Sequence, residues 1–184
     1  MGVCLSLSGC ILQGVMRNTM ASPSTIGVTS GASFVGYMTL VAFPAYAYLL
    51  PVGSIVGAFT TTMLIYALAY QKGVSPVKMI LSGMAVSALF GAFNDMIKTF
   101  FAESLGNASG FLVGGLNGTE WKSLYSMLPY AAAGILICMF LPARMNILML
   151  GDETANALGL RTERFRFLLI VVSSLLSGAA ISVA

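Results

Sequence analysis

Few residues in this sequence are suited to catalysis or metal binding. The 184-residue chain contains no histidine, which removes the commonest acid–base catalyst and the commonest metal ligand. Its three cysteines, Cys4, Cys10 and Cys138, lie in apolar segments without CxxC spacing, so neither a disulfide framework nor a zinc site is indicated. No stretch matches GxxxxGK(S/T), the loop that cradles phosphates. We therefore expect no catalytic residue, no metal site and no cofactor in this chain.

Two pairs of charged residues that contain an acid could form a binding site or an ion pair. Asp152 and Glu153 are adjacent, and neighbours on a helix point about 100° apart, so they would chelate a metal ion poorly. Asp95 and Lys98 are three residues apart and share a helix face, where they can form an ion pair. A charge within a membrane span often marks a transport pathway, but Lys98 lies near the end of its predicted span and can reach water. A structural pair and a pathway contact are both open.

The composition is that of a protein spanning a membrane several times. The chain is 58% hydrophobic and 8% charged, with a mean hydropathy of +0.91, whereas a soluble domain is about 25% charged. The net charge of +3 is too small to indicate a nucleic-acid partner. The apolar runs are continuous rather than alternating, which predicts an all-α bundle of transmembrane helices in one domain, 1–184. The predicted spans are 1–16, 28–46, 50–70, 77–101, 126–142 and 167–184.

The two end segments predict that the chain is incomplete at both ends. Residues 1–16 are shorter than the roughly 20 residues that a span needs. The last run reaches Ala184 without a polar flank. The alternative is a short first helix and a C-terminus at the membrane edge.

The basic residues predict which loops face the cytoplasm. If the helices alternate in direction, two lysines, Lys98 and Lys122, fall on the outer side and the other seven basic residues on the inner side. The positive-inside rule then places 143–166 in the cytoplasm. The inner set is Arg17, Lys72, Lys78, Arg144, Arg161, Arg164 and Arg166.

A short charged helix is predicted within that cytoplasmic segment. Asp152 can cap the helix start, Glu153 suits its first turn, and Gly159 can end it, giving a helix over 152–158. Isolated helices below about 12 residues are marginal in water, so this one must pack against something. Leu148, Leu150, Ala155 and Leu158 offer apolar contacts. Docking of a soluble partner and an ordinary basic loop are the two interpretations.

A second polar stretch, 18–32, is rich in small residues and interrupted by Pro23. Irregular backbone at membrane depth is tolerated where it is buried in protein or lines a cavity. It is either part of a pathway or a cytoplasmic turn before the next helix. Glycine and serine residues four apart, such as Gly27 and Gly31, or Gly53 and Gly57, favour close helix packing. The candidate pathway or gate residues are Gln13, Asn18, Pro23, Gly31 and Asp95.

Three motifs, in order, resemble the FecCD-type permeases of ABC importers, which carry iron-siderophores, haem and vitamin B12. GVCLSLSGCILQGVMRNTMASPSTIGVTSGA resembles that family's G-x-x-L-x-x-S-G-x-x-x-Q-x-x-x-x-N-P-L-A-x-P-x-x-L-G-x-x-x-G-A. ILSGMAVSALF resembles L-x-G-x-A-x-x-x-L, and RMNILMLGDETANALGL resembles N-x-L-x-L-G-(D/E)-x-x-A-x-x-L-G. The likeness covers essentially the whole chain. Thr19 and Met20 replace the family's usual Pro-Leu, so the turn there is expected to be less rigid.

The resemblance implies a permease subunit in a bacterial cell membrane. This chain would contain about six spans or partial spans of the family's ten-span fold. Two permease subunits, identical or different, would surround the pathway. An ATPase subunit would hydrolyse ATP, and an extracytoplasmic binding protein would deliver the chelate. Residues 146–160 match the family's cytoplasmic coupling segment. The residues implied to dock on the ATPase are Leu150, Gly151, Asp152, Glu153, Ala155, Leu158 and Gly159.

Three alternatives stay open beside the importer. A channel or ion-coupled secondary transporter would use Asp95 as its coupling carboxylate. A membrane enzyme is disfavoured by the lack of histidine and of clustered interior carboxylates. The chain as it stands could also be an inactive fragment. The sequence does not identify the chelate or the residues that contact it.

Overall fold

The computed structural model describes residues 1–43, 49–70, 75–105 and 121–183. In those ranges every regular element is a helix, as the sequence predicted. The helices are α1 (Gly2–Met16), α2 (Val28–Ala42), α3 (Leu50–Ala69), α4 (Pro76–Phe100), α5 (Ala102–Leu105), α7 (Trp121–Met139), α8 (Pro142–Met149), α9 (Asp152–Ala157) and α10 (Thr162–Ile181).

Four of these helices are long and apolar enough to cross a membrane. α3, α4, α7 and α10 have 20, 25, 19 and 20 residues, and about 20 residues at 1.5 Å each match the hydrocarbon core. α1 and α2 are apolar but have 15 residues each. α7 and α10 begin five residues before the predicted spans, because Trp121 and Thr162 open helices that continue unbroken into the apolar runs. The predicted end of the second span, 44–46, lies outside the described residues.

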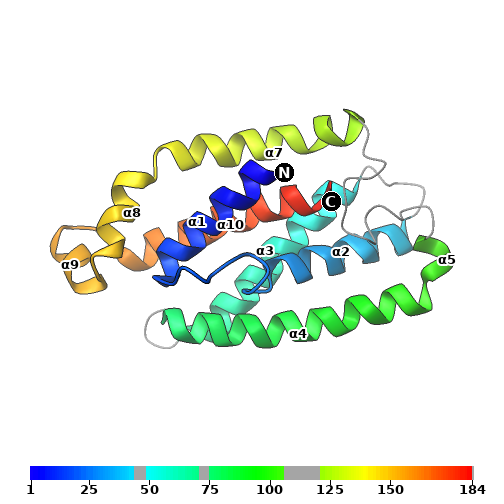
Figure 1. Cartoon of the computed structure of the whole chain (residues 1–184), viewed down its shortest axis with the longest axis horizontal. Helices are drawn as coiled ribbons and strands as arrows, with labels where there is room; N and C mark the ends of the chain where they lie inside the picture. Colours follow the sequence, from blue (N-terminus) through cyan, green and yellow to red (C-terminus); the bar gives the residue numbers. More distant parts are fainter. Residues whose placement is uncertain (44–48, 71–74, 106–120, 184) are drawn as a thin grey trace.

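The basic residues gather at one end of the bundle, as the charge pattern predicted. Figure 1 shows α8, α9, the start of α4 and the end of α1 together at that end, and α5 with the start of α7 at the other. Lys98 and Lys122 belong to the second end. Lys72 lies outside the described residues. The arrangement fits a single membrane orientation, with the α8–α9 end on the positive-inside side.

α10 is the central helix of the bundle. It packs against α1, α3 and α7 (Figure 1), and 67% of its apolar window is buried, against 17% for α4 and α7. Small residues make this possible, since a Cβ on Gly178 would lie 2.8 Å from Cα of Ile55 in α3. On the neighbouring pair, a Cβ on Gly57 of α3 would lie 2.6 Å from the carbonyl oxygen of Gly31 in α2. Close packing through small residues, expected from their spacing, is therefore observed at these positions.

Hydroxyl groups join α1 to α10 in the interior. Ser8 on α1 lies with its Oγ 2.7 Å from Oγ of Ser173 and 2.6 Å from Oγ of Ser177, and donates to the Ser173 carbonyl at 3.0 Å. All three serines are fully buried. Hydrogen bonds between membrane helices contribute about 0.6–2 kcal/mol each. This serine cluster therefore fixes the register of α1 against α10.

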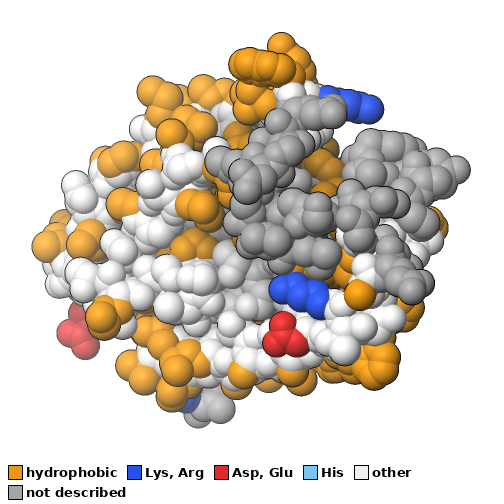
Figure 2. Space-filling view, turned by 45° about the vertical axis from the view of Figure 1, so that its right-hand side comes forward, with side chains coloured by type: hydrophobic (Ala, Val, Ile, Leu, Met, Phe, Trp, Pro, Cys, Tyr) orange, Lys and Arg blue, Asp and Glu red, His pale blue; other side chains and the backbone are white. Residues whose placement is uncertain are grey.

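The outward faces of α4 and α7 are apolar. Leu81, Met84 and Phe93 on α4 and Leu128 and Leu136 on α7 are exposed. Figure 2 shows hydrophobic side chains across much of one face, with few charged side chains among them. Such faces suit contact with lipid or with further membrane helices.

The α3–α10 contact generates the first prediction. Gly178→Val should destabilise the protein by about 1–3 kcal/mol, because the added atoms collide with α3 backbone and overpack the interior. Thermal unfolding of the complete permease in detergent measures the effect. Gly91→Val is the matched control, since a Cβ on Gly91 meets nothing within 4 Å. Equal losses in the two variants would contradict this account of the packing.

Candidate functional site

Residues 146–160, which the resemblance implied as the coupling segment, lie at the basic end of the bundle and contain the end of α8 and all of α9. α8 starts with Pro142 in its first turn, and α9 contains six residues. Gly151 and Gly159 flank α9 with φ values of +118° and +82°, which side chains other than glycine rarely adopt. The predicted short helix ended by Gly159 is confirmed. Figure 1 shows α9 as the element projecting farthest at this end.

The Asp152 carboxylate does not cap α9, contrary to the sequence prediction. The N-cap residue is Gly151, and no side chain makes a cap hydrogen bond there. Asp152 Oδ1 instead accepts hydrogen bonds from Nη2 of Arg17 at 2.5 Å and from Nη2 of Arg166 at 2.9 Å. Because Arg17 follows α1 and Arg166 belongs to α10, one carboxylate oxygen connects α9 to two membrane helices.

The three members of this charge cluster differ in burial. The side chain of Arg166 is 3% exposed, against 34% for Arg17 and 45% for Asp152. A buried guanidinium needs a negatively charged partner, because removing it from water is costly. The charge pattern counted Arg166 with the inner loops, whereas the structure places it in α10 with its side chain buried. The spacing of Arg166 could have predicted its burial. It continues a helical pattern of buried residues on α10 that includes Ile170, Ser173 and Ser177.

Arg17 makes a second contact that links α1 to α8. Its Nη2 also donates to the carbonyl oxygen of Leu148 at 3.0 Å. Its backbone is left-handed, with φ 49° and ψ 40°, and its N–H bonds to the Gln13 carbonyl at the end of α1. This conformation costs an L-residue roughly 1–2 kcal/mol and persists where surrounding contacts impose it. Arg17 is thus a fixed junction between α1, α8 and α9.

The residues that the resemblance implied for docking divide into two groups. Leu150 and Leu158 are 64% and 61% exposed, and Glu153 and Gly159 are also exposed. Ala155 is fully buried, while Asp152 and Gly151 are partly buried. The first group is exposed in and around α9, and the second includes Ala155, which is buried against the bundle, and Asp152, which binds Arg17 and Arg166. Their role in docking stays a prediction.

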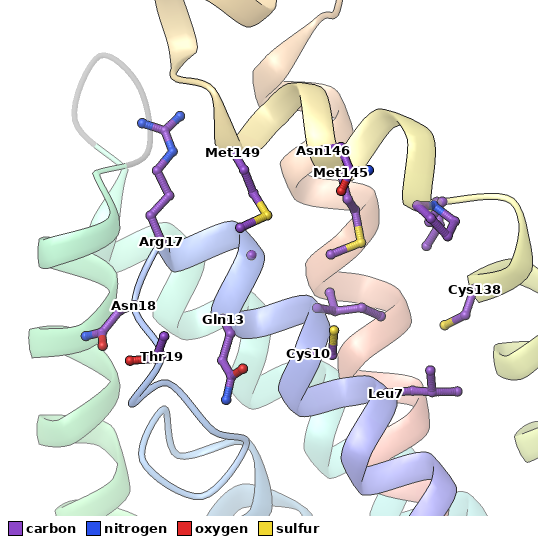
Figure 3. A pocket seen from close by; sticks show the side chains of 14 residues that line it. Leu7, Cys10, Gln13, Arg17, Asn18, Thr19, Cys138, Met145, Asn146 and Met149 are labelled. Carbon is purple, nitrogen blue, oxygen red and sulfur yellow. The ribbon is translucent and has the colours of Figure 1, made fainter.

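Two hollows contain three of the five pathway candidates. The first, of about 460 Å³, lies between α1 and the α7–α8 corner. Figure 3 shows Gln13, Arg17 and Asn18 at this hollow, with Met145 and Met149 of α8 beside them. The second, of about 540 Å³, lies between α1 and the start of α2 and is lined by Gln13 and Pro23. Gln13 is therefore shared by both hollows.

The other two candidates lie in neither hollow. Gly31 is buried where α2 meets Thr61 of α3, so it serves helix packing. Asp95 is exposed on α4, and the predicted ion pair with Lys98 is not formed. Lys98 Nζ instead lies 5.3 Å from the centre of the Tyr37 ring, a distance at which a cation is attracted to the aromatic face.

The contacts of Asp152 connect separate structural elements. Within the described residues, no three His, Cys, Asp or Glu side chains converge as metal ligands. In the same ranges the only ion pairs are those that Asp152 makes with Arg17 and Arg166. These contacts join elements 135 and 14 residues apart in the sequence.

Comparisons with known proteins agree on one family. The profile of the FecCD transport family matches residues 1–184. The chain is 34% identical to the cobalamin import system permease protein BtuC of Halobacterium salinarum, matching 100% of this chain and 50% of that protein. It is 32% identical to the Fe(3+)-citrate import system permease protein YfmD of Bacillus subtilis and to the ferric enterobactin transport system permease protein FepG of Escherichia coli, matching all of this chain and 55% and 56% of theirs.

A solved structure shares the fold. It is described as a metal-chelate type ABC transporter in an inward-facing conformation, with a TM-score of 0.86 and 30% identity. The match covers 99% of this chain and 59% of the other. The chain spans about half the length of the curated relatives that it matches.

The Asp152 cluster generates a prediction about stability. Asp152→Asn should lower the free energy of unfolding by about 1–3 kcal/mol, because buried Arg166 loses a charged acceptor. Thermal unfolding of the complete permease in detergent measures this. Glu153→Gln is the matched control, since it removes the adjacent exposed charge, which makes no ion pair. A loss in the control as large as that in Asp152→Asn would rule out the proposed role of the cluster.

Proposed function

Because this chain belongs to the FecCD transport family, we propose that it acts as the membrane-spanning part of a permease subunit in an ATP-driven importer. Its cargo would be a metal chelate of the iron-siderophore, haem or cobalamin type. The names of its relatives, which include permeases for cobalamin, Fe(3+)-citrate and enterobactin, support this class. The observation that carries the proposal is a projecting α9 joined through Asp152 to two membrane helices.

The proposed partner at the projecting end is a separate ATPase subunit. The sequence has no phosphate-cradling loop, so ATP hydrolysis would need another chain. α9 offers that partner a compact face with two exposed leucines, Leu150 and Leu158, beside exposed Glu153. Exposed apolar side chains rimmed by charge are typical of a protein interface. Glycines at both ends and Ala155 below hold the face in one orientation.

The contacts of α9 suggest how movement of the ATPase would reach the membrane. A displacement of α9 moves Asp152, which holds Arg17 at the end of α1 and Arg166 on α10. The serine cluster joins the same two helices deeper in the bundle. α1 and α10 would therefore move together rather than slide past each other. Packed elements of this kind change between discrete arrangements.

The rest of the proposed assembly follows from the family. A second permease subunit, identical or different, would complete the pathway, and an extracytoplasmic binding protein would deliver the chelate. Gln13, which lines both hollows, is the proposed pathway contact in this chain. An amide suits a pathway for chelates because it can donate and accept hydrogen bonds without carrying charge.

Crosslinking tests the docking proposal directly. Glu153→Cys and Leu158→Cys, placed in a permease in which Cys4, Cys10 and Cys138 are replaced by serine, should crosslink to the ATPase subunit in the assembled transporter. Trp121→Cys is the control, because Trp121 is equally exposed but starts α7 at the opposite end of the bundle. Crosslinks at position 121 alone, or at none of the three, would overturn the proposal.

Transport measurements test the mechanical role of Asp152. Asp152→Asn should reduce ATP-driven chelate uptake in proteoliposomes by about fivefold or more while ATP hydrolysis continues, because α9 no longer holds both arginines by charge. Asp152→Glu should restore part of the uptake. Glu163→Gln is the control, since it removes an exposed acid of the same segment outside the charge cluster.

The same assay separates the importer from an ion-coupled transporter. An ion-coupled mechanism predicts uptake that continues without ATP and is abolished by loss of the ion gradient or by Asp95→Asn. Uptake that depends on ATP would support the importer. If Asp152→Asn left the uptake per ATP hydrolysed unchanged, the mechanical role of Asp152 would be excluded.

A further inference from the structure

A third hollow, which we call the arginine hollow, lies at the coupling segment, whose Ile147, Leu158, Gly159 and Leu160 help to line it. It has a volume of about 480 Å³, within the roughly 300–1,000 Å³ common for small-molecule sites. Arg144 comes from α8, and Arg161 and Arg164 come from the start of α10. Leu158, Phe165 and Leu168 supply much of its apolar lining.

The positive charge of the arginine hollow is not neutralised by nearby acids. All three arginines are exposed, and none forms an ion pair with a described residue. The nearest acids in the sequence, Glu153 and Glu163, do not line the hollow. Asp152 is already shared between Arg17 and Arg166. Three guanidinium groups around one hollow favour an anionic ligand, above all a phosphate, whose oxygens match the planar fork of arginine.

The lining of the hollow changes from charged to apolar along α10. Arg164 and Leu168 are four residues apart and share one face of α10. Arg161 precedes the membrane helix, whereas Leu168 belongs to its apolar part and is 43% exposed. Arg144 lines the same hollow from α8. With the apolar part of α10 in the membrane, the arginines would lie near the lipid headgroups and Leu168 near the acyl chains.

We propose that the arginine hollow binds one anionic glycerophospholipid of the cytoplasmic leaflet. Its phosphate lies among Arg144, Arg161 and Arg164, and part of one acyl chain lies along Phe165 and Leu168. Basic pockets between membrane helices on this side are suited to anionic headgroups. The choline group of a zwitterionic lipid would add a positive charge beside three arginines. The acidic surface of a soluble protein could reach the arginines but would not fill the apolar part at membrane depth.

The arginine hollow shares Leu158 and Gly159 with the proposed docking face, but lipid binding itself does not depend on the transport function. Because residues of both α8 and α10 line the hollow, a bound lipid would stabilise the corner that holds the coupling segment. Lipid binding can be measured on the complete permease without an ATPase or a chelate. If the transport proposal failed, the lipid result would therefore still stand. If the lipid proposal failed, the transport proposal would be unaffected.

The test compares phosphatidylglycerol with phosphatidylcholine, titrated onto the detergent-solubilised complete permease and followed by native mass spectrometry. Phosphatidylglycerol should bind in preference. Each substitution Arg144→Gln, Arg161→Gln or Arg164→Gln should weaken its binding about fivefold, and all three together on the order of 100-fold. Lys122→Gln, which removes an exposed charge at the other end of the bundle, should have no effect. Arg164→Lys, which keeps the charge but not the planar fork, should weaken binding less than Arg164→Gln. Thermal unfolding checks that each variant is folded.

Two further measurements identify the source of the phosphate. Leu168→Gln should weaken phosphatidylglycerol without changing the binding of glycerol phosphate, and glycerol phosphate should bind far more weakly than the lipid. Equal binding of glycerol phosphate and lipid would assign the hollow to a free anion and overturn the proposal. Equal binding of the two lipids, or an equal loss in Lys122→Gln, would also overturn it. Displacement of the lipid by the ATPase subunit would assign the arginines to the protein interface instead.

Discussion

The buried guanidinium of Arg166 sets the arrangement of the whole coupling end. A cation that is 3% exposed needs a charged acceptor within hydrogen-bonding distance, and Asp152 supplies it. Asp152 can reach Arg166 only if the start of α9 lies against α10, so the chain must reverse sharply before and after a helix of six residues. Gly151 and Gly159 make those reversals with backbone angles that other residues rarely adopt. The position of α9 therefore follows from one charge in α10.

The interior of the bundle shows why that charge belongs on α10. This helix is buried on most of its surface, and its small residues allow α1 and α3 to approach closely. Apolar packing alone would leave the helices free to shift along one another, because lipid tails satisfy apolar side chains equally well. The serine cluster and the Asp152 cluster fix α1 against α10 at two separate depths. Directional contacts thus supply the specificity that hydrophobicity cannot provide in a membrane.

The sequence predicted the features that depend on local composition and missed those that depend on distant partners. Continuous apolar runs located the long helices, and glycine located the end of α9, because these signals act within a few residues. The bond from Arg17 to Asp152 crosses 135 residues, and no spacing rule connects such positions. For Asp95 and Lys98, the local spacing suggested a contact that the structure does not form. Their spacing allowed a pair, but the Tyr37 ring from α2 engages the lysine.

The two faces of the coupling segment place different demands on its residues. On the inward face, Asp152 combines with buried Arg166 and half-buried Arg17, so its geometry is fixed by strong charge-assisted bonds. On the outward face, exposed Leu150 and Leu158 have no such constraint and can adapt to a partner surface. A rigid inward attachment is necessary for transmission, because a flexible one would absorb the displacement before it reached α1 and α10. The exposed face determines which partner binds, and the Asp152 cluster determines whether that binding moves the membrane helices.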